Sequence, residues 1–275
     1  MARKTILITG CSSGIGLYSA HALHQAGYQV LATARQTKDV EHLRSLGLTS
    51  HQLDLADSQS VKDAFEWATK TADKNIFALF NNGAYAQPGA LEDISRSLLK
   101  QQFETNVFGW HQLTNLCLEH MHKFGEGRII QNSSVLGFVA MKYRGSYNAS
   151  KYAIEGLSDT LRLELKGTNI FVSLIEPGPI LSQFRANALQ QFRLNIDMQN
   201  SRYKTTYRKM LERLETEGPA VPFTQGPEMV YKRLLHAIES ANPKARYYVT
   251  KPTYLLGFLK RLLPSAWLDA VVKNA

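Results

Sequence analysis

Short apolar stretches recur along the chain, with room for a helix between most of them. They are mostly continuous rather than alternating in polarity, which is typical of strands covered on both faces. The stretches are Thr5–Thr9, Gln29–Thr33, His51–Leu53, Ile76–Phe80, Arg128–Gln131, Ile170–Ile175 and Arg246–Val249. Helical patterns lie between them at Gly16–Ala26, Ser58–Thr71, Ser95–Phe124 and Tyr147–Lys166. This alternation predicts an α/β fold built on a doubly wound parallel sheet.

No internal repeat or low-complexity linker divides the chain, so we expect a single domain over residues 1–275. Its one compositional break, at about residues 182–225, is polar and basic with scattered Leu and Phe. A long segment of this kind inside a compact domain is typical of a lid over a substrate site.

The stretch at about residues 254–272 has leucines at helical spacing around Lys260 and Arg261. Pro264 interrupts it, so the pattern predicts two short amphipathic helices. Such a tail either packs against the body or a partner subunit, or rests on an anionic lipid surface.

The 275 residues carry 32 Lys and Arg against 23 Asp and Glu, a net charge of +9. That charge favours an anionic partner, namely a nucleotide, a nucleic acid or a lipid surface. The basic residues are spread and form no nucleic-acid motif, so we expect no nucleic-acid partner. No apolar run reaches the roughly 18 residues of a membrane-spanning helix. Only two cysteines are present, which indicates the reducing cytoplasm. Contact with a membrane surface stays open.

A glycine-rich loop follows the first predicted strand and opens the first helix. Glycines permit a tight turn and let the backbone approach a pyrophosphate, which the free amides of the helix N-terminus attract. An ordinary turn also contains glycines, but the position directly after the first strand favours a dinucleotide site. The expected contacts in this loop are Gly10, Ser12, Ser13, Gly14, Ile15 and Gly16.

The end of the second predicted strand distinguishes two nicotinamide cofactors. An acid there accepts a hydrogen bond from the ribose 2′-hydroxyl of NAD, whereas an arginine suits the 2′-phosphate of NADP. The chain has Arg35 and no acid before Asp39, so NADP is expected, with Ser12 adding a hydroxyl to the same phosphate. After the third strand, Asp54 and Leu55 lie where a carboxylate can accept from the adenine amine. A capping or turn role fits Asp54 equally well.

Ser134, Tyr147 and Lys151 form the most specific constellation. Ser134 follows the fifth predicted strand, and Lys151 lies four residues after Tyr147 on the same helix face. A phenol with a reference pKa of about 10 is a poor acid or base near neutral pH, and we expect the lysine cation to lower that pKa. The serine hydroxyl can hold a substrate oxygen while the phenol moves a proton and a hydride is transferred at the neighbouring carbon. The histidines form no metal-like pair, so no metal is expected.

These motifs resemble, in their order and spacing, those of the classical short-chain dehydrogenase/reductase family over Thr5–Ile180. The matching pieces are the glycine loop, Asn81-Asn82, Asn106 in Asn-Val-Phe-Gly, Ser134, Tyr147 with Lys151, and Pro177-Gly178-Pro179-Ile180. The resemblance implies a Rossmann-type sheet of about seven strands in a three-layer α/β/α arrangement. It also implies a homodimer or homotetramer.

The resemblance implies a role for each matching residue. Tyr147 is the acid/base, Ser134 orients the carbonyl, and Lys151 binds the nicotinamide ribose and tunes Tyr147. Asn106 holds a water that continues the proton relay. Further cofactor contacts are implied for Asn81, Pro177, Gly178, Ile180 and Ser182.

Two positions depart from the family's usual pattern. The family's Asn-Asn-Ala-Gly reads Asn81-Asn82-Gly83-Ala84 here, so Asn81 rather than Gly83 is the expected cofactor contact. Ser182 stands where the family often has a threonine that holds the nicotinamide carboxamide, and it keeps the hydroxyl.

Within the family, the sequence is most similar to bacterial NADP-dependent aldehyde reductases and to animal hydroxysteroid and retinol dehydrogenases. That similarity implies a small apolar carbonyl or alcohol as substrate. The leading hypothesis is an NADP(H)-dependent oxidoreductase that interconverts a carbonyl and its alcohol. A non-catalytic, NADP-sensing Rossmann protein is the alternative, but such proteins usually lose the tyrosine or the lysine. An epimerase or dehydratase can share both residues, but usually has a longer carboxyl-terminal domain.

Overall fold

Seven parallel strands form one sheet in the computed structural model, which describes residues 3–216, 218–219 and 221–273. The strands are β1 (Thr5–Ile8), β2 (Gln29–Ala34), β3 (Thr49–Gln52), β4 (Ile76–Asn81), β5 (Gly127–Asn132), β6 (Ile170–Glu176) and β7 (Arg246–Tyr248). All seven were predicted, with bounds that differ by at most two residues. Residues 1–2 and 274–275 of the expected domain, and 217 and 220 of the expected lid, lie outside the described residues.

The strand order β3-β2-β1-β4-β5-β6-β7 places the topological switch point, where the direction of strand addition reverses, between β1 and β4. The chain winds outward from β1 to β3 and then returns to β4 on the other side of β1. Loops that leave β1 and β4 therefore diverge at the carboxyl edge of the sheet, where ligands bind in doubly wound folds.

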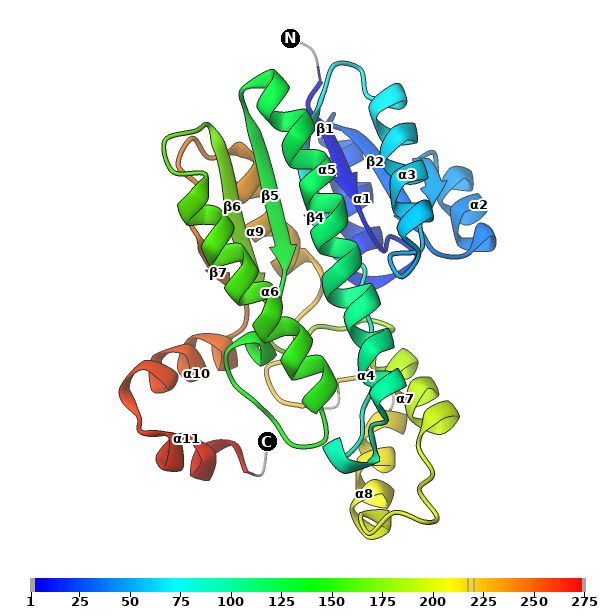
Figure 1. The fold of residues 1–275 in the computed structure, drawn as a ribbon, viewed down its shortest axis with the longest axis vertical. Helices are drawn as coiled ribbons and strands as arrows, with labels where there is room; N and C mark the ends of the chain where they lie inside the picture. Colours follow the sequence, from blue (N-terminus) through cyan, green and yellow to red (C-terminus); the bar gives the residue numbers. More distant parts are fainter. Residues whose placement is uncertain (1–2, 217, 220, 274–275) are drawn as a thin grey trace.

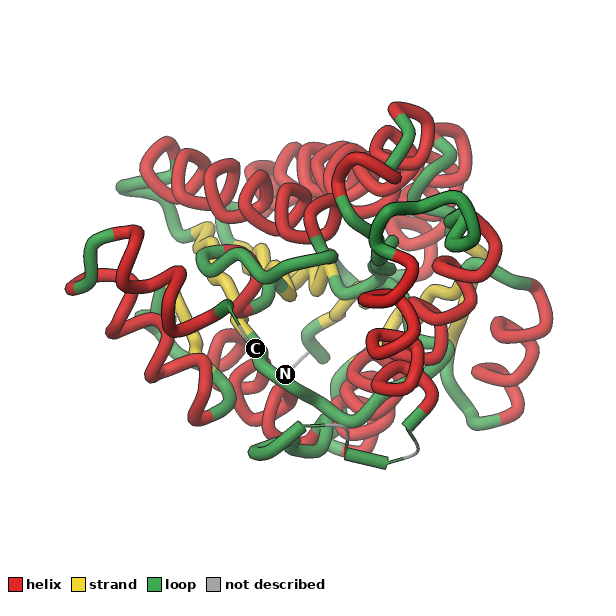
Figure 2. The backbone as a smooth tube through the Cα atoms, turned by 90° about the horizontal axis from the view of Figure 1, so that it is seen from below, coloured by secondary structure: helices red, strands yellow, loops and turns green. Residues whose placement is uncertain are grey.

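Helices cover both faces of the sheet and give the three α/β/α layers that the sequence predicted (Figure 1). One face carries α1 (Gly14–Gln25), α2 (Thr37–Ser45) and α9 (Glu228–Glu239). The other carries α3 (Ser58–Thr71), α5 (Gly109–Phe124) and α6 (Gly145–Glu164). Seen from below, the strands run between these two helical layers (Figure 2). Each layer buries its own apolar cluster against the sheet, so the continuous apolar strands of the sequence are covered on both sides.

The long helix predicted over Ser95–Phe124 is interrupted at its middle. It consists of α4 (Arg96–Phe103), a π-helical turn η2 (Glu104–Phe108) and then α5. A π turn accommodates an extra residue in the helix and is frequent at functional sites. Apolar periodicity does not reveal it, because the hydrophobic stripe continues on both sides of the turn.

Two helical pairs extend beyond the carboxyl ends of the strands, one on each side of the molecule (Figure 1). The first is α7 (Phe184–Asn195) with α8 (Lys204–Glu215), in the expected lid. The second is α10 (Lys251–Leu262) with α11 (Ser265–Val272), and Pro264 stands between them. Short 3₁₀ turns η1 (Leu91–Asp93) and η3 (Val135–Gly137) complete the structure. No helix among the described residues is long and apolar enough to cross a bilayer.

Candidate active site

The glycine loop occupies the carboxyl end of β1 in backbone conformations that favour glycine. Gly10 and Gly14 have positive φ angles of 69° and 56°. A Cβ on Gly10 would clash with the backbone of Gly83, and one on Gly16 would clash with the Gly10 carbonyl and lie 2.7 Å from Asn82 Nδ2. Glycines at these positions are therefore needed for the close approach of two loops at the switch point.

The N-terminus of α1 is open at this edge. Ser13 is the N-cap and its side chain makes no capping hydrogen bond, and the first turn contains no acidic residue. Ser12 is exposed and Ile15 is half-buried. The first-turn amides and the positive end of the helix dipole thus form an anion-binding surface, and the loop fits a dinucleotide pyrophosphate.

The loops after β2 and β3 continue this edge. Arg35 is exposed directly after β2. Asp54 uses one carboxylate oxygen, Oδ1, to accept from the Ala56 amide at 3.0 Å, so the turn role left open by the sequence is present. Leu55 is 7% exposed and packs in the core cluster of the α3–α5 layer.

The two asparagines after β4 divide their contacts in a way that the sequence did not indicate. The Asn81 side chain is fully buried and donates to Thr114 Oγ1 on α5 at 3.0 Å. It is Asn82 whose Nδ2 donates to the carbonyls of Thr9 and Gly10 at 3.0 and 3.1 Å. Asn82 also accepts from Asn132 Nδ2 at 2.9 Å, and so links the ends of β1, β4 and β5. The only signal in the sequence was a second polar residue after an otherwise apolar strand.

Ser134, Tyr147 and Lys151 are brought to the same region of the sheet edge. Ser134 caps η3 directly after β5, where its Oγ accepts from the Leu136 amide at 3.1 Å. Tyr147 and Lys151 lie one turn apart on α6, and both are buried. Lys151 Nζ donates to the Asn132 carbonyl at 2.7 Å and lies 5.6 Å from the centre of the Tyr147 ring. The sequence predicted this helix face and its register correctly.

Lys151 has a further partner that the sequence did not single out. Its Nζ lies 4.3 Å from the centre of the Trp110 ring, at the distance of a cation–π contact. The Trp110 indole donates to the Gly83 carbonyl at 2.7 Å, which fixes the ring plane. Trp110 lies four residues after Asn106, so it shares that side of the helix.

Burial controls the titration of the tyrosine and the lysine. It raises the pKa of the Tyr147 phenol, and the neighbouring Ser134 hydroxyl and Arg144 guanidinium only partly oppose that change. It also lowers the pKa of Lys151 to about 7, against the opposite effect of Glu155. The pKa of Tyr147 is therefore raised overall, because desolvation of the phenolate outweighs the Ser134 hydrogen bond and the Arg144 charge; the expected effect of Lys151 on this pKa stays a prediction. A phenol held in its protonated form is suited to donate a proton to a carbonyl oxygen.

Asn106 lies within the π turn and is fully buried. Its Nδ2 donates to the Tyr85 carbonyl at 2.9 Å and to Ser150 Oγ at 3.2 Å, while its Oδ1 accepts from the Tyr85 amide at 3.2 Å. Ser150 Oγ in turn donates to the Tyr147 carbonyl at 2.8 Å. The π turn thus ties the loop after β4 to the helix that carries Tyr147.

The segment after β6 begins against the Ser134 loop. The Pro177 carbonyl accepts from the Val135 amide at 2.9 Å. Gly178 is packed so closely on the start of α10 that a Cβ there would meet Thr250 Oγ1 and lie 2.9 Å from Thr253 Oγ1. The chain therefore turns past Ser134 with little space beside it.

The same segment then reaches the glycine loop. Ile180 forms a parallel bridge with Gln225, which joins the two ends of the expected lid. Ser182 is exposed, and its Cβ would lie 2.8 Å from a Cβ built on Gly14. The structure thus brings together the predicted residues from the glycine loop and from the lid entrance, 168 positions apart along the chain.

An apolar wall surrounds the Tyr147 phenol. The Phe184 ring at the start of α7 lies edge-on to Tyr147, with the ring centres 5.3 Å apart. The other members of this cluster come from the loops after β4 and β5, from α7 and from α10: Ala86, Val135, Leu136, Phe138, Met141, Ala188 and Leu256. The neighbours of the phenol are therefore mainly apolar, with the Ser134 hydroxyl and the Arg144 guanidinium as polar exceptions.

A metal site and a reactive thiol each have requirements that the described residues can be compared with. Among the described residues, no group of three or more His, Cys, Asp or Glu could hold a metal ion. Burial raises the pKa of Cys11 in the glycine loop to about 12, so its thiol packs rather than reacts.

The fold and the site geometry define a nicotinamide-dependent oxidoreductase of the Rossmann type. Residues 4–192 match the short chain dehydrogenase family, and the chain belongs to this family. It is 43% identical to the uncharacterised oxidoreductase YbbO of Escherichia coli, over 99% of this chain and 95% of that protein. It is 37% identical to human retinol dehydrogenase 8, over 69% of this chain and 63% of that protein. A short-chain dehydrogenase from Streptomyces avermitilis has a similar structure, with a TM-score of 0.76 at 25% identity, over 98% of this chain and 93% of that one.

Proposed function

We propose that this protein is an NADP(H)-dependent oxidoreductase that interconverts an apolar aldehyde or ketone and its alcohol. One observation carries the proposal. The buried Tyr147 phenol stands within an apolar wall, with Ser134 beside it and Lys151 one turn along α6. The similarity of the chain to a retinol dehydrogenase agrees with a long, apolar substrate.

The proposed chemistry divides the reaction between the cofactor and the chain. The nicotinamide, when bound, supplies or takes up the hydride. Ser134 holds the substrate oxygen and Tyr147 donates a proton to it in reduction, or accepts one in oxidation. Lys151, with a pKa lowered to about 7, can exchange a proton with its surroundings near neutral pH. We assign it the nicotinamide ribose, and we assign Asn106 a water that connects this proton path to solvent.

The cofactor would follow the carboxyl edge of the sheet. The glycine loop from Gly10 to Gly16 receives the pyrophosphate at the open N-terminus of α1. Arg35 after β2 and Ser12 after β1 are both exposed. We assign them the 2′-phosphate, which favours NADP over NAD. The remaining proposed contacts are Asp54, Leu55, Asn81, Pro177, Gly178, Ile180 and Ser182.

We further propose that α7 and α8 form a lid that selects the substrate. Phe184 and Ala188 of α7 belong to the apolar wall.

We also propose that the protein assembles as two or four copies, which sedimentation velocity would measure.

A substrate screen tests the proposal. NADPH or NADH oxidation would be measured with long-chain aldehydes, retinal and ketosteroids, alongside binding of both cofactors by calorimetry. We expect turnover with NADPH on at least one of these classes and much weaker use of NADH. Tight NADPH binding without turnover on any class would contradict the proposal and favour a cofactor sensor, and equal use of NADH would contradict the cofactor assignment.

A further inference from the structure

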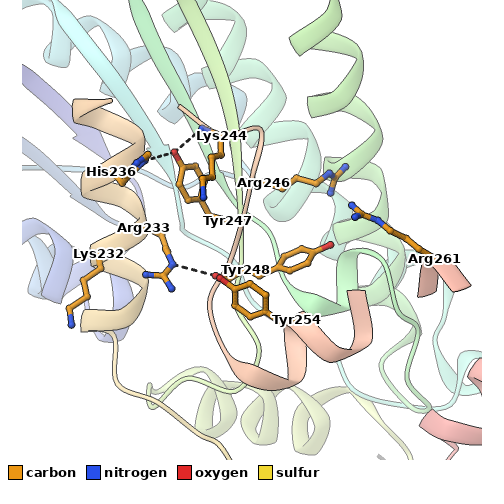
Figure 3. Close-up of a pocket in the computed structure, with 9 residues that line it drawn as sticks. All are labelled: Lys232, Arg233, His236, Lys244, Arg246, Tyr247, Tyr248, Tyr254 and Arg261. Carbon is orange, nitrogen blue, oxygen red and sulfur yellow. Dashed lines mark hydrogen bonds between the residues drawn. The ribbon is translucent and has the colours of Figure 1, made fainter. Parts of the chain in front are cut away.

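A cavity of about 430 Å³ lies between α9, β7 and α10, away from the proposed active site. Its lining is almost entirely basic or aromatic and contains no carboxylate: Lys232, Arg233, His236, Lys244, Arg246, Tyr247, Tyr248, Tyr254 and Arg261. Figure 3 shows these side chains on α9, on the loop before β7, on β7 and on α10, with the guanidinium groups of Arg246 and Arg261 turned toward each other and Lys232 extending outward. The four lining cations other than Arg246 have no carboxylate partner among the described residues, and they repel each other unless an anion lies among them.

Most of these charges are available to a ligand. Among the described residues, Arg246 is the one lining cation with ion pairs, to Glu155 and Asp159, and it also donates to Glu176 Oε1. Arg233 donates only to the Tyr248 carbonyl, at 3.3 Å. Lys232, Lys244 and Arg261 form no ion pair within the described part of the chain.

Three tyrosine hydroxyl groups line the cavity. That of Tyr247 already has hydrogen-bond partners, whereas those of Tyr248 and Tyr254 can donate to a ligand. The Tyr247 hydroxyl is held by His236 Nδ1 at 2.8 Å and by the Lys244 amide at 2.9 Å. No hydrogen bond of the Tyr248 or Tyr254 hydroxyl is present among the described residues. Guanidinium forks, ammonium groups and phenol donors around a cavity of this size match the oxygens of a phosphate group.

The helix α10 indicates where this phosphate comes from. Tyr254 and Arg261 line the cavity, and Leu255, Phe258 and Leu262 on the same helix are 58%, 61% and 62% exposed. Their spacing of three and four residues forms one stripe. The adjacent face of α10 is partly buried through Leu256 and Leu259, which pack with Leu263 against η3 and α11. The outer stripe is therefore apolar surface that the core does not need.

We propose that this face binds an anionic phospholipid bilayer, with a lipid phosphate in the basic cavity and the outer stripe of α10 among the acyl chains. An exposed apolar stripe beside basic side chains is the combination that interfacial helices use. Lys260 on α10 and the 66% exposed Trp267 on α11 extend the same chemistry. The proposal concerns binding alone and stands whether or not the proposed reaction is correct.

Vesicle co-sedimentation of the full chain tests it. The vesicles would be phosphatidylcholine alone or an equimolar mixture with phosphatidylglycerol, and inorganic pyrophosphate would be titrated separately by calorimetry. We expect binding to the mixed vesicles, none to phosphatidylcholine, and loss of binding at high salt. A basic residue at an anionic membrane surface is worth about 1 kcal/mol, so Lys232→Gln with Arg261→Gln should weaken vesicle binding at least about tenfold.

Matched variants separate the two halves of the surface. Lys62→Gln with Lys166→Gln removes the same charge from exposed sites elsewhere and should leave binding within about twofold, because surface charges beyond a Debye length of ~10 Å are screened. Leu255→Ser with Phe258→Ser should weaken vesicle binding and leave pyrophosphate binding unchanged. Equal unfolding midpoints would show that each variant folds.

Three results would overturn the proposal. Pyrophosphate binding that is lost in Lys232→Gln with Arg261→Gln, without any binding of mixed vesicles, would assign the cavity to a free phosphate compound. If both double substitutions of basic residues weaken vesicle binding equally, the attraction to the vesicle is non-specific. If vesicles are ignored and the serine variant converts a dimer to a monomer in sedimentation velocity, the stripe is an interface between copies of this chain.

Discussion

Replacing Glu176 by glutamine should reveal a buried carboxyl group that stays protonated near neutral pH. Glu176 is the last residue of β6 and is fully buried. Its Oε1 accepts from Arg246 Nη1 at 2.5 Å, whereas Oε2 has no hydrogen-bond partner among the described residues. Burial and the neighbouring Glu155 carboxylate raise the pKa of Glu176 to about 8, although Arg246 acts in the opposite direction. Glutamine has the shape of the protonated acid and does not titrate.

The sign of the pH dependence follows from proton binding. In the folded protein Glu176 keeps its proton up to about pH 8, whereas the ordinary value for the unfolded chain is 4.5. Between these pH values the folded state binds more protons, so this residue makes the free energy of unfolding fall as pH rises. A difference of one in pKa corresponds to about 1.4 kcal/mol, so the total over this window is on the order of a few kcal/mol. Glu176→Gln should therefore be near neutral at pH 5 and increasingly stabilising toward pH 8–9.

Urea unfolding at pH 5, 7 and 9 measures this difference. The exposed Glu66, which pairs with Lys70 on the surface of α3, provides a matched control. Glu66→Gln should change stability by no more than about 0.5 kcal/mol, with no growth between pH 5 and pH 9. If Glu176→Gln destabilises the protein equally at all three pH values, Glu176 is ionised in the folded state and the reasoning fails.

Four further variants test the site and its scaffold. Tyr147→Phe should lower turnover about 10²–10⁴-fold and leave NADPH affinity unchanged by calorimetry; full activity would assign the proton transfer to another group. Arg35→Asp should weaken NADPH binding and strengthen NADH binding, since an acid repels a 2′-phosphate and accepts from a 2′-hydroxyl; an unchanged preference would contradict this. Gly16→Ala should destabilise the protein by about 1–3 kcal/mol through overpacking, because its Cβ would lie 2.7 Å from Asn82 Nδ2. Gly156→Ala on α6, which has no atom within 4 Å of its Cβ, should instead stabilise it by up to about 1 kcal/mol; opposite signs in urea unfolding are required.

The succession of strands along the chain and the helices α1, α3, α5 and α6 could be read from the sequence because they depend on local patterns, whereas α2 and α9 were not predicted. Each strand is an apolar run, and each crossover helix is long enough to return the chain to the same edge of the sheet. The positions of Gly10, Tyr147 and Lys151 followed in the same way. A loop after the first strand lies at the carboxyl edge, and residues four apart on a helix share one face.

Side-chain orientation at the ends of strands could not be read in this way. Asn81 ends β4 and Asn82 follows it, yet one faces Thr114 on α5 and the other reaches the glycine loop. The outcome depends on which neighbouring element supplies a partner. The π turn at Asn106 was equally hidden, because one extra residue in a helix leaves its apolar stripe nearly continuous.

Electrostatic environments and composite surfaces were decided by the tertiary structure alone. The sequence places a lysine one turn from Tyr147, but only the packing of α6 against η3 and α7 determines that burial raises the pKa of the phenol. The basic cavity collects residues from α9, β7 and α10, and none of these segments is distinctive by itself. Desolvation and convergence of charge arise from contacts between residues far apart along the chain, whereas periodicity and spacing report only on residues that are close in sequence.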